Sequence, residues 1–140
     1  MIPFWSMAQI EIKEGIYYSE DGETYTGFYS EYFDNGNIKI KTELKNGQPD
    51  GITTLFYKSG VKKEMRSYNM GKMHGQWISF FENEKKSAIA LYEDGIKHGE
   101  WKVWDENGIL RYIMNYEKGK KKGLWKMFDE KGDLINEKEY

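Results

Sequence analysis

The chain has 140 residues, a formal net charge of −2 and no cysteine. Its length is typical of one domain, and a near-neutral charge without a long basic stretch argues against nucleic acid as a partner. The lack of cysteine excludes disulfides and thiolate chemistry. Hydrophobic residues make up only 39%, which is lean for a two-layer core, whereas 16% aromatic residues is rich.

The first eight residues, 1–8, are apolar and end in Ser6-Met7-Ala8. Small residues in this −3 and −1 relation are what signal peptidase accepts. We therefore expect residues 1–8 to be the remnant of an export signal, which places the protein in the periplasm, at the cell surface or outside the cell. The alternative is a cytoplasmic protein whose apolar N-terminus packs over its first hairpin. No segment approaches the ~20 apolar residues that span a bilayer, so no integral membrane segment is expected.

The rest of the chain repeats every 24 residues without insertion or deletion. Glycine returns at position 1 and, except in the truncated last unit, at position 21 of each unit, and such fixed-register repetition indicates an array of one small structural unit. The five units are 27–50, 51–74, 75–98, 99–122 and 123–140. Residues 9–26 precede them as an extension that contains a degenerate half unit.

Each unit contains a turn signal between two short segments rich in aromatic and β-branched residues. Asn35-Gly36 and Asn107-Gly108 are strong hairpin signals, and we expect both residues of such a pair to take positive φ. The second glycine, as in Asn46-Gly47, turns the chain toward the next unit. The predicted strands are 27–33, 38–44, 52–57, 61–68, 76–81, 86–92, 100–104, 109–116, 124–128 and 134–139.

These strands predict an all-β fold: a single-layer antiparallel β-meander, or solenoid, of stacked 24-residue β-hairpins. Large rings recur at three positions of the unit, so we expect aromatic columns that run across the strands and supply burial without a second layer. Position 3 holds Tyr29, Thr53, Trp77, Trp101 and Trp125; position 6 holds Tyr32, Phe56, Phe80, Trp104 and Phe128; position 18 holds Leu44, Tyr68, Tyr92, Tyr116 and Tyr140.

The units resemble MORN repeats in their bacterial variant form. The resemblance rests on the Gly-x-Trp opening, the aromatic residue at position 6, the Asn-Gly turn and the tyrosine before the second glycine, and it covers residues 27–140. It implies a repeat protein grouped with YwqK-type antitoxins, whose eukaryotic relatives serve as scaffolds, oligomerisers and proposed lipid binders. The chain departs from the pattern at Glu84, which replaces the hairpin glycine, and at Thr53, which replaces the opening aromatic residue.

No catalytic constellation is evident, so we expect no enzyme activity, no cofactor and no metal site. The chain contains neither a Gly-x-Ser-x-Gly elbow nor a His-Glu-x-x-His pair. His74 and His98 share the last position of successive units, which separates them by about 9.6 Å, too far for one zinc ion. They are expected to be turn residues.

The sequence therefore favours a protein-binding module of antitoxin or immunity type, whose partner is a cognate toxin or an envelope protein. Its expected anchors are Trp77, Trp101, Trp125 and Tyr92. The alternative is a structural scaffold, a homo-oligomer joined through the ends of its sheet, in which Lys120, Lys121 and Lys122 meet anionic lipid. A third option is a glycan that stacks on the tryptophans.

Overall fold

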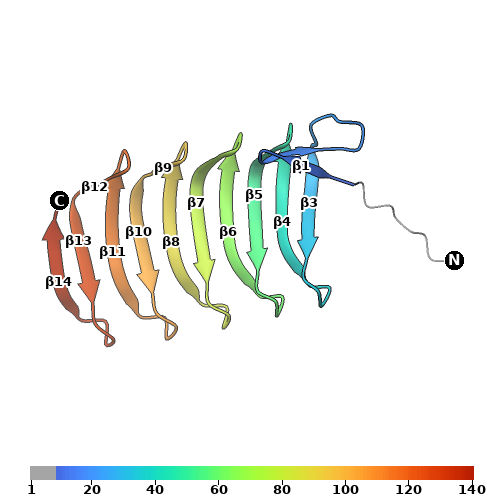
Figure 1. Ribbon diagram of the computed structural model, residues 1–140. Coiled ribbons are helices and arrows are strands. Elements are labelled where there is room, and N and C mark those ends of the chain that lie inside the picture. Colours follow the sequence, from blue (N-terminus) through green and yellow to red (C-terminus); the bar gives the residue numbers. More distant parts are fainter. Residues whose placement is uncertain (1–8) are drawn as a thin grey trace.

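The computed structural model describes residues 9–140, and the regular elements within them are all β-strands (Figure 1). The strands are β1 (Glu11–Lys13), β2 (Ile16–Tyr18), β3 (Gly27–Tyr32), β4 (Ile38–Lys45), β5 (Gln48–Phe56), β6 (Lys62–Asn69), β7 (Lys72–Phe80), β8 (Lys86–Glu93), β9 (Ile96–Lys97), β10 (Gly99–Trp104), β11 (Leu110–Glu117), β12 (Lys120–Lys121), β13 (Leu124–Phe128) and β14 (Leu134–Glu139). Residues 1–8, which carry the predicted export signal, lie outside this description. Residues 9–140 include no helix with the length and apolarity to cross a membrane.

The sheet follows chain order from β3 at one end to β14 at the other (Figure 1). All its pairings are antiparallel, which confirms the predicted meander of stacked hairpins. The short strands β9 and β12 pair with β8 and β11 just before β10 and β13 begin. The sequence pattern predicted neither these two strands nor β1 and β2, because two or three residues are too few to show an alternating pattern.

Two-residue turns connect one unit to the next. At Asn46-Gly47 the φ angles are 50° and 77°, and at Asp94-Gly95 they are 49° and 84°. Positive φ at both central residues defines the type I′ turn, whose twist matches that of the flanking strands. The strands consequently continue to the turn itself, and β5 begins at Gln48 rather than at the predicted residue 52.

The hairpin tips within each unit have a different geometry. At the first tip Phe33 N–H donates to the Asn37 carbonyl at 2.8 Å, and Gly36 N–H donates to the Phe33 carbonyl at 3.0 Å. Only Gly36 of the Asn35-Gly36 pair has positive φ, at 85°, so the expectation that both residues would take it is wrong. The loop has three residues, in which a type I turn is followed by one left-handed residue. A register shift beside the tips accommodates the extra residue.

Strand alternation divides each unit between two faces. Position 3 pairs with position 16 across each hairpin, as Trp77 does with Ala90, so positions 3, 16 and 18 share one face. We call this the ladder face. Positions 2, 4, 6 and 15 lie on the opposite face, where Phe56, Met65 and Phe80 line one hollow.

The hairpin of β1 and β2 crosses the sheet near the first connecting turn (Figure 1), and its Tyr17 lies over the start of the ladder face. Tyr17 donates its backbone N–H to the Gly47 carbonyl at 3.0 Å, and Gly47 N–H donates to the Tyr25 carbonyl at 2.7 Å. The ring of Tyr17 meets the ring of Tyr29 with 5.0 Å between centroids. The N-terminal extension therefore forms a local second layer, which the sequence pattern did not predict.

The most buried side chains of residues 9–140 lie on this covered part. Leu44 and Thr42 are 2% exposed and Thr53 is 5% exposed. The hydroxyls of Thr42 and Thr53 lie 2.5 Å apart and share a hydrogen bond, which satisfies both polar groups away from water. Side chains on a bare single-layer sheet cannot be buried to this extent, so the covering hairpin creates the core.

Candidate functional site: the aromatic ladder

Six rings form one continuous ladder across units three to five. Neighbouring centroids are 4.8 to 5.6 Å apart. In order along the sheet the rings are Trp77, Tyr92, Trp101, Tyr116, Trp125 and Tyr140. This separation is close to the spacing of about 4.8 Å between strands, so each ring packs on the ring of the next strand. Positions 3 and 18, which the sequence shows as separate columns, merge into one alternating ladder.

Hydrogen bonds fix the indole rings in the ladder. Trp101 Nε1–H donates to the Leu91 carbonyl at 3.0 Å, and Trp125 Nε1–H donates to the Asn115 carbonyl at 3.0 Å. Leu91 and Asn115 occupy equivalent positions, where a backbone carbonyl of the neighbouring strand faces the ring. Because both the ring faces and the N–H groups are restrained, the ladder is a preorganised surface.

The third indole has a side-chain partner. Trp77 Nε1–H donates to Glu64 Oε2 at 3.1 Å, and Glu64 accepts from Arg66 Nε at 2.8 Å. The Arg66 guanidinium lies 4.3 Å from the centroid of the Trp77 ring. Arg66 thus closes the ladder on the side of unit two, where Thr53 stands instead of an aromatic residue.

Lysine side chains lie over the rings of units four and five. Lys97 Nζ is 4.9 Å from the Trp101 centroid, and Lys121 Nζ is 4.5 Å from the Trp125 centroid. Lys138 Nζ lies 4.8 Å from the centroid of Tyr140. Such contacts are attractive because the ring face carries partial negative charge. Within residues 9–140, none of these three ammonium groups has a carboxylate within 4.0 Å, so the ladder face carries uncompensated positive charge.

The three lysines predicted as one patch are divided between the faces. Lys121 lies on the ladder, whereas Lys120 and Lys122 alternate away from it. Lys122 forms an ion pair with Glu117. The hydrogen bond from Lys122, together with its charge, holds the pKa of the Glu117 carboxyl below its usual value.

Two hollows lie beside the ladder. One, of about 290 Å³, is lined by Trp77 and Trp101 and includes Ala88 and Ala90. It opens because positions 14 and 16 hold alanine in unit three, whereas the same positions hold Glu64 and Arg66 in unit two. We call this hollow the alanine trough.

The second hollow, of about 280 Å³, lies in unit five. Its lining includes Trp125 and Tyr140 beside Met114 and Met127. The ladder is thus flanked by two apolar depressions on the same face, each suited to one or two side chains of a bound segment.

Four residues that the sequence predicted as binding anchors lie next to one another in the structure, and their role in binding stays a prediction. Trp77, Tyr92, Trp101 and Trp125 are brought together in one surface. Burial raises the pKa of the Tyr92 hydroxyl, and the charge of Tyr116 acts in the same direction. Lys97, Lys138 and the two alanines were missed. The shared position 23 of Lys97 and Lys121 was the one available signal for this pair.

The histidine and acidic side chains of the described residues do not gather into one cluster. No group of three His, Asp or Glu side chains in residues 9–140 is arranged to hold a metal ion. His74 lies within strand β7, not in a turn, and its Nδ1 is 3.3 Å from Asp94. His98 Nδ1 faces a different acid, Glu93, at 3.8 Å. The two imidazoles therefore have separate acidic neighbours.

Comparison with known proteins supports the repeat assignment. The model of the MORN repeat variant family matches residues 25–46 and 97–118. The two matches begin 72 residues apart, which is three units of 24, and each spans one hairpin, β3–β4 or β10–β11. No curated protein matches the chain. The protein thus contains MORN repeat variant sequence in two segments that follow the register of its hairpins.

Proposed function

We propose that the ladder face of units three to five binds another protein, and that an extended segment of the partner lies across it. The observation that supports this proposal most is that a segment of the chain itself docks on the same face. On the same face of unit one, the chain's own β2 places Tyr17 against Tyr29 and hydrogen-bonds to the connecting turn at Gly47. The protein thus contains an example of a strand-like segment docked on this surface, and MORN repeats are consistent with a binding module.

The chemistry of the ladder specifies the partner segment. Its apolar or aromatic side chains fit the alanine trough and the hollow beside Trp125. Its acidic residues complement Lys97, Lys121 and Lys138, which have no carboxylate within 4.0 Å in residues 9–140. We further propose that the partner is a cognate toxin or an envelope protein, as expected for an antitoxin or immunity protein, and that the protein is exported.

The test exploits the difference between units two and three. The double variant Ala88→Glu/Ala90→Arg gives unit three the residues that unit two carries as Glu64 and Arg66, so it fills the trough with a pair that this fold already accommodates. We expect it to fold normally and to retain less than about a tenth of the wild-type affinity for a partner captured from the native host. Gln76→Arg, an exposed substitution on the opposite face of β7, is the matched control.

Two further results bear on the proposal. Because the contacts include uncompensated lysines, the association rate should fall as salt is raised. A partner that binds the trough-filled variant and the wild type equally well, or whose association is insensitive to salt, would contradict docking on the ladder face. A sugar ligand that stacks on the tryptophans would instead show saturable heat in calorimetry with glycans.

The second candidate function is a self-assembling scaffold. Strand β14 is the last strand of the sheet, and all six of its residues are exposed. An unprotected edge strand is a template for pairing with another chain. Ile135→Lys on this edge should abolish concentration-dependent assembly in sedimentation velocity. Co-sedimentation with anionic vesicles that is unaffected by Lys→Glu changes at 120–122 would exclude the associated lipid-binding role.

A further inference from the structure

Side-chain amides join two of the four pairs of neighbouring hairpin tips in residues 9–140. The fourth and fifth tips are linked below the tips instead, where Arg111 Nε–H donates to the Phe128 carbonyl at 2.9 Å. Between the first and second tips, Asn35 and Asn37 both donate to the Lys58 carbonyl at 2.9 Å. Between the third and fourth tips, Asn83 donates to the Glu106 carbonyl at 3.1 Å. These amide bridges hold neighbouring tips together at the ends of the strands that lie away from the connecting turns (Figure 1).

The second and third tips lack such a bridge. Ser59 and Val61 occupy the positions of Asn35 and Asn37, and in residues 9–140 neither side chain hydrogen-bonds to the next tip. The nearest link is below the tips, where Tyr57 Oη–H donates to the Phe80 carbonyl at 2.8 Å. A hollow of about 600 Å³ opens between these two tips, larger than either hollow beside the ladder.

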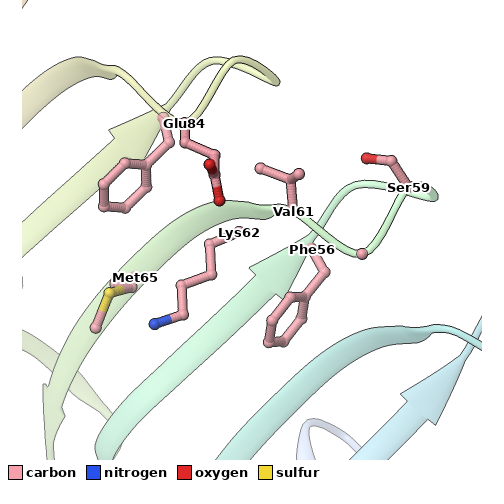
Figure 2. A pocket seen from close by; sticks show the side chains of 8 residues that line it. Phe56, Ser59, Val61, Lys62, Met65 and Glu84 are labelled. Atoms are coloured by element: carbon pink, nitrogen blue, oxygen red, sulfur yellow. The ribbon is translucent and has the colours of Figure 1, made fainter.

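The hollow combines an apolar lining with two opposite charges. Its apolar groups are Phe56, Val61, Met65 and Phe80. Glu84 and Lys62 lie on its rim, and Figure 2 shows the Glu84 carboxylate directed from its tip toward the strand that carries Val61 and Lys62. Neither charge has an ion-pair partner within 4.0 Å among the described residues, and they do not pair with each other.

Glu84 occupies this rim in a strained conformation. Its φ is 67°, in the left-handed region, and the other four tips place glycine at the equivalent position. A residue with a Cβ is unfavourable there, and strain of this kind gathers at functional sites. Glycine would give a more stable turn, so stability does not account for the carboxylate.

We propose that this hollow is a binding site for a small zwitterion with an apolar body, namely an apolar amino acid or a short apolar peptide. The ligand's ammonium pairs with Glu84, its carboxylate pairs with Lys62, and its side chain packs on Phe56 and Phe80. A ligand that carries both charges is required because the two rim charges are opposite and separated. The volume lies within the range of small-molecule sites, about 300 to 1,000 Å³. This site is on the opposite face from the proposed protein-binding ladder and is independent of it.

The test is a titration of the isotope-labelled protein by amide-detected NMR with L-phenylalanine and with the dipeptide phenylalanyl-phenylalanine. We expect saturable shifts around Phe56, Phe80 and Glu84 with a Kd below about 10 mM for at least one of them. Whichever of these two compounds binds more tightly shows whether the site takes a free amino acid or a peptide. N-acetylphenylalanine, which lacks the ammonium, and phenylalaninamide, which lacks the carboxylate, should each bind about tenfold more weakly.

Variants separate binding from folding. Glu84→Gly restores the residue of the other tips, so it should keep or raise the Tm while weakening phenylalanine binding about tenfold. Lys62→Gln should weaken binding similarly. Lys86→Gln, which changes the equivalent lysine of unit three outside the hollow, is the matched control and should bind as the wild type does. The proposal is overturned if neither ligand gives saturable shifts, if the blocked analogues bind equally well, or if Glu84→Gly binds unchanged.

Discussion

The first two units and the last three units bury the same face in different ways. In the first two, Tyr29 and Tyr68 are accompanied by smaller side chains, and Thr42, Leu44 and Thr53 are at most 5% exposed beneath the N-terminal hairpin. In the last three, six rings pack side by side along the sheet, and all but the exposed terminal Tyr140 are only partly exposed.

The difference shows that a one-layer sheet has two ways to remove apolar surface from water. It can recruit a covering segment, which supplies a true core but uses up the face. Alternatively it can stack large rings laterally, which stabilises neighbouring strands and leaves the outer side of each ring accessible. The stacked rings keep a rigid aromatic surface available for a partner. The covered region does not, because the N-terminal hairpin of the same chain already occupies it.

The largest expected effect is at the centre of the ladder. Trp101→Ala removes ring contacts with Tyr92 and Tyr116 and a hydrogen bond to the Leu91 carbonyl, and should lower the free energy of unfolding by about 3 kcal/mol. Phe28→Ala, which changes a ring that is 62% exposed on the opposite face, should cost less than about 1 kcal/mol. Urea unfolding measures both, and equal losses would show that lateral stacking contributes nothing.

In the covered region, the ring of Tyr17 packs on the ring of Tyr29. Tyr17→Ala should lower the free energy of unfolding by about 2 kcal/mol, because it exposes the side chains beneath the N-terminal hairpin. Hydrogen exchange should accelerate at Thr42 and Thr53 and stay unchanged in units four and five. Ile12→Ala, in the same hairpin but 45% exposed, is the control. Acceleration that spreads along the whole ladder would contradict the division into two regions.

The buried threonine pair gives a smaller effect with a characteristic pattern. Thr53→Val leaves the Thr42 hydroxyl without its partner at 2.5 Å and should cost about 1 to 2 kcal/mol. Thr42→Val/Thr53→Val removes both hydroxyls and should be less harmful than the single change, since no buried polar group is then unsatisfied. A double variant that loses the sum of the two single effects, measured by urea unfolding, would argue against a satisfied pair under the cover.

The third hairpin tip, which carries Glu84, lies at the boundary between the two regions. A substitution there should raise the free energy of unfolding rather than lower it. Glu84→Gly relieves the positive φ of 67° and should raise the free energy of unfolding by about 1 kcal/mol or less, since glycine also increases the entropy of the unfolded chain. Gly108→Glu makes the reverse change at the fourth tip, where φ is 87°, and should destabilise by a similar amount. Thermal unfolding of both variants tests whether the two tips are equivalent.

The smallest expected effect is on how the free energy of unfolding changes with pH in the alkaline range. Burial, with added contributions from Glu31 and Tyr68, raises the pKa of the Tyr17 hydroxyl above its usual value. The unfolded chain therefore ionises first, and Tyr17 contributes stability that is complete below about pH 10 and is lost as pH rises through the folded pKa. Tyr17→Phe should lose less stability between pH 9 and 11 than the wild type, by about a few tenths of a kcal/mol. If the variant instead loses more stability than the wild type over this pH range, the pKa of Tyr17 is not raised by folding.

The sequence by itself determined the repeat and the order of the strands from residue 27 onward. Glycine at fixed intervals sets where the chain can turn, and local turns between short aromatic segments leave only a meander of neighbouring hairpins. It also identified Trp77, Trp101 and Trp125 as one column, because equal positions in successive units must align across a regular sheet.

Only the tertiary structure decided which columns meet and which part of the face stays open. The Trp and Tyr columns merge because Trp77 pairs with Ala90 and Tyr92 pairs with Gly75, so the two rings are diagonal neighbours on one face across small residues, and pairing register is a property of two strands rather than one. The cover over Leu44 and the hollow at Glu84 depend on contacts between residues that are distant in sequence or belong to successive units. A repeating pattern describes what the units share, whereas these sites arise where the units differ.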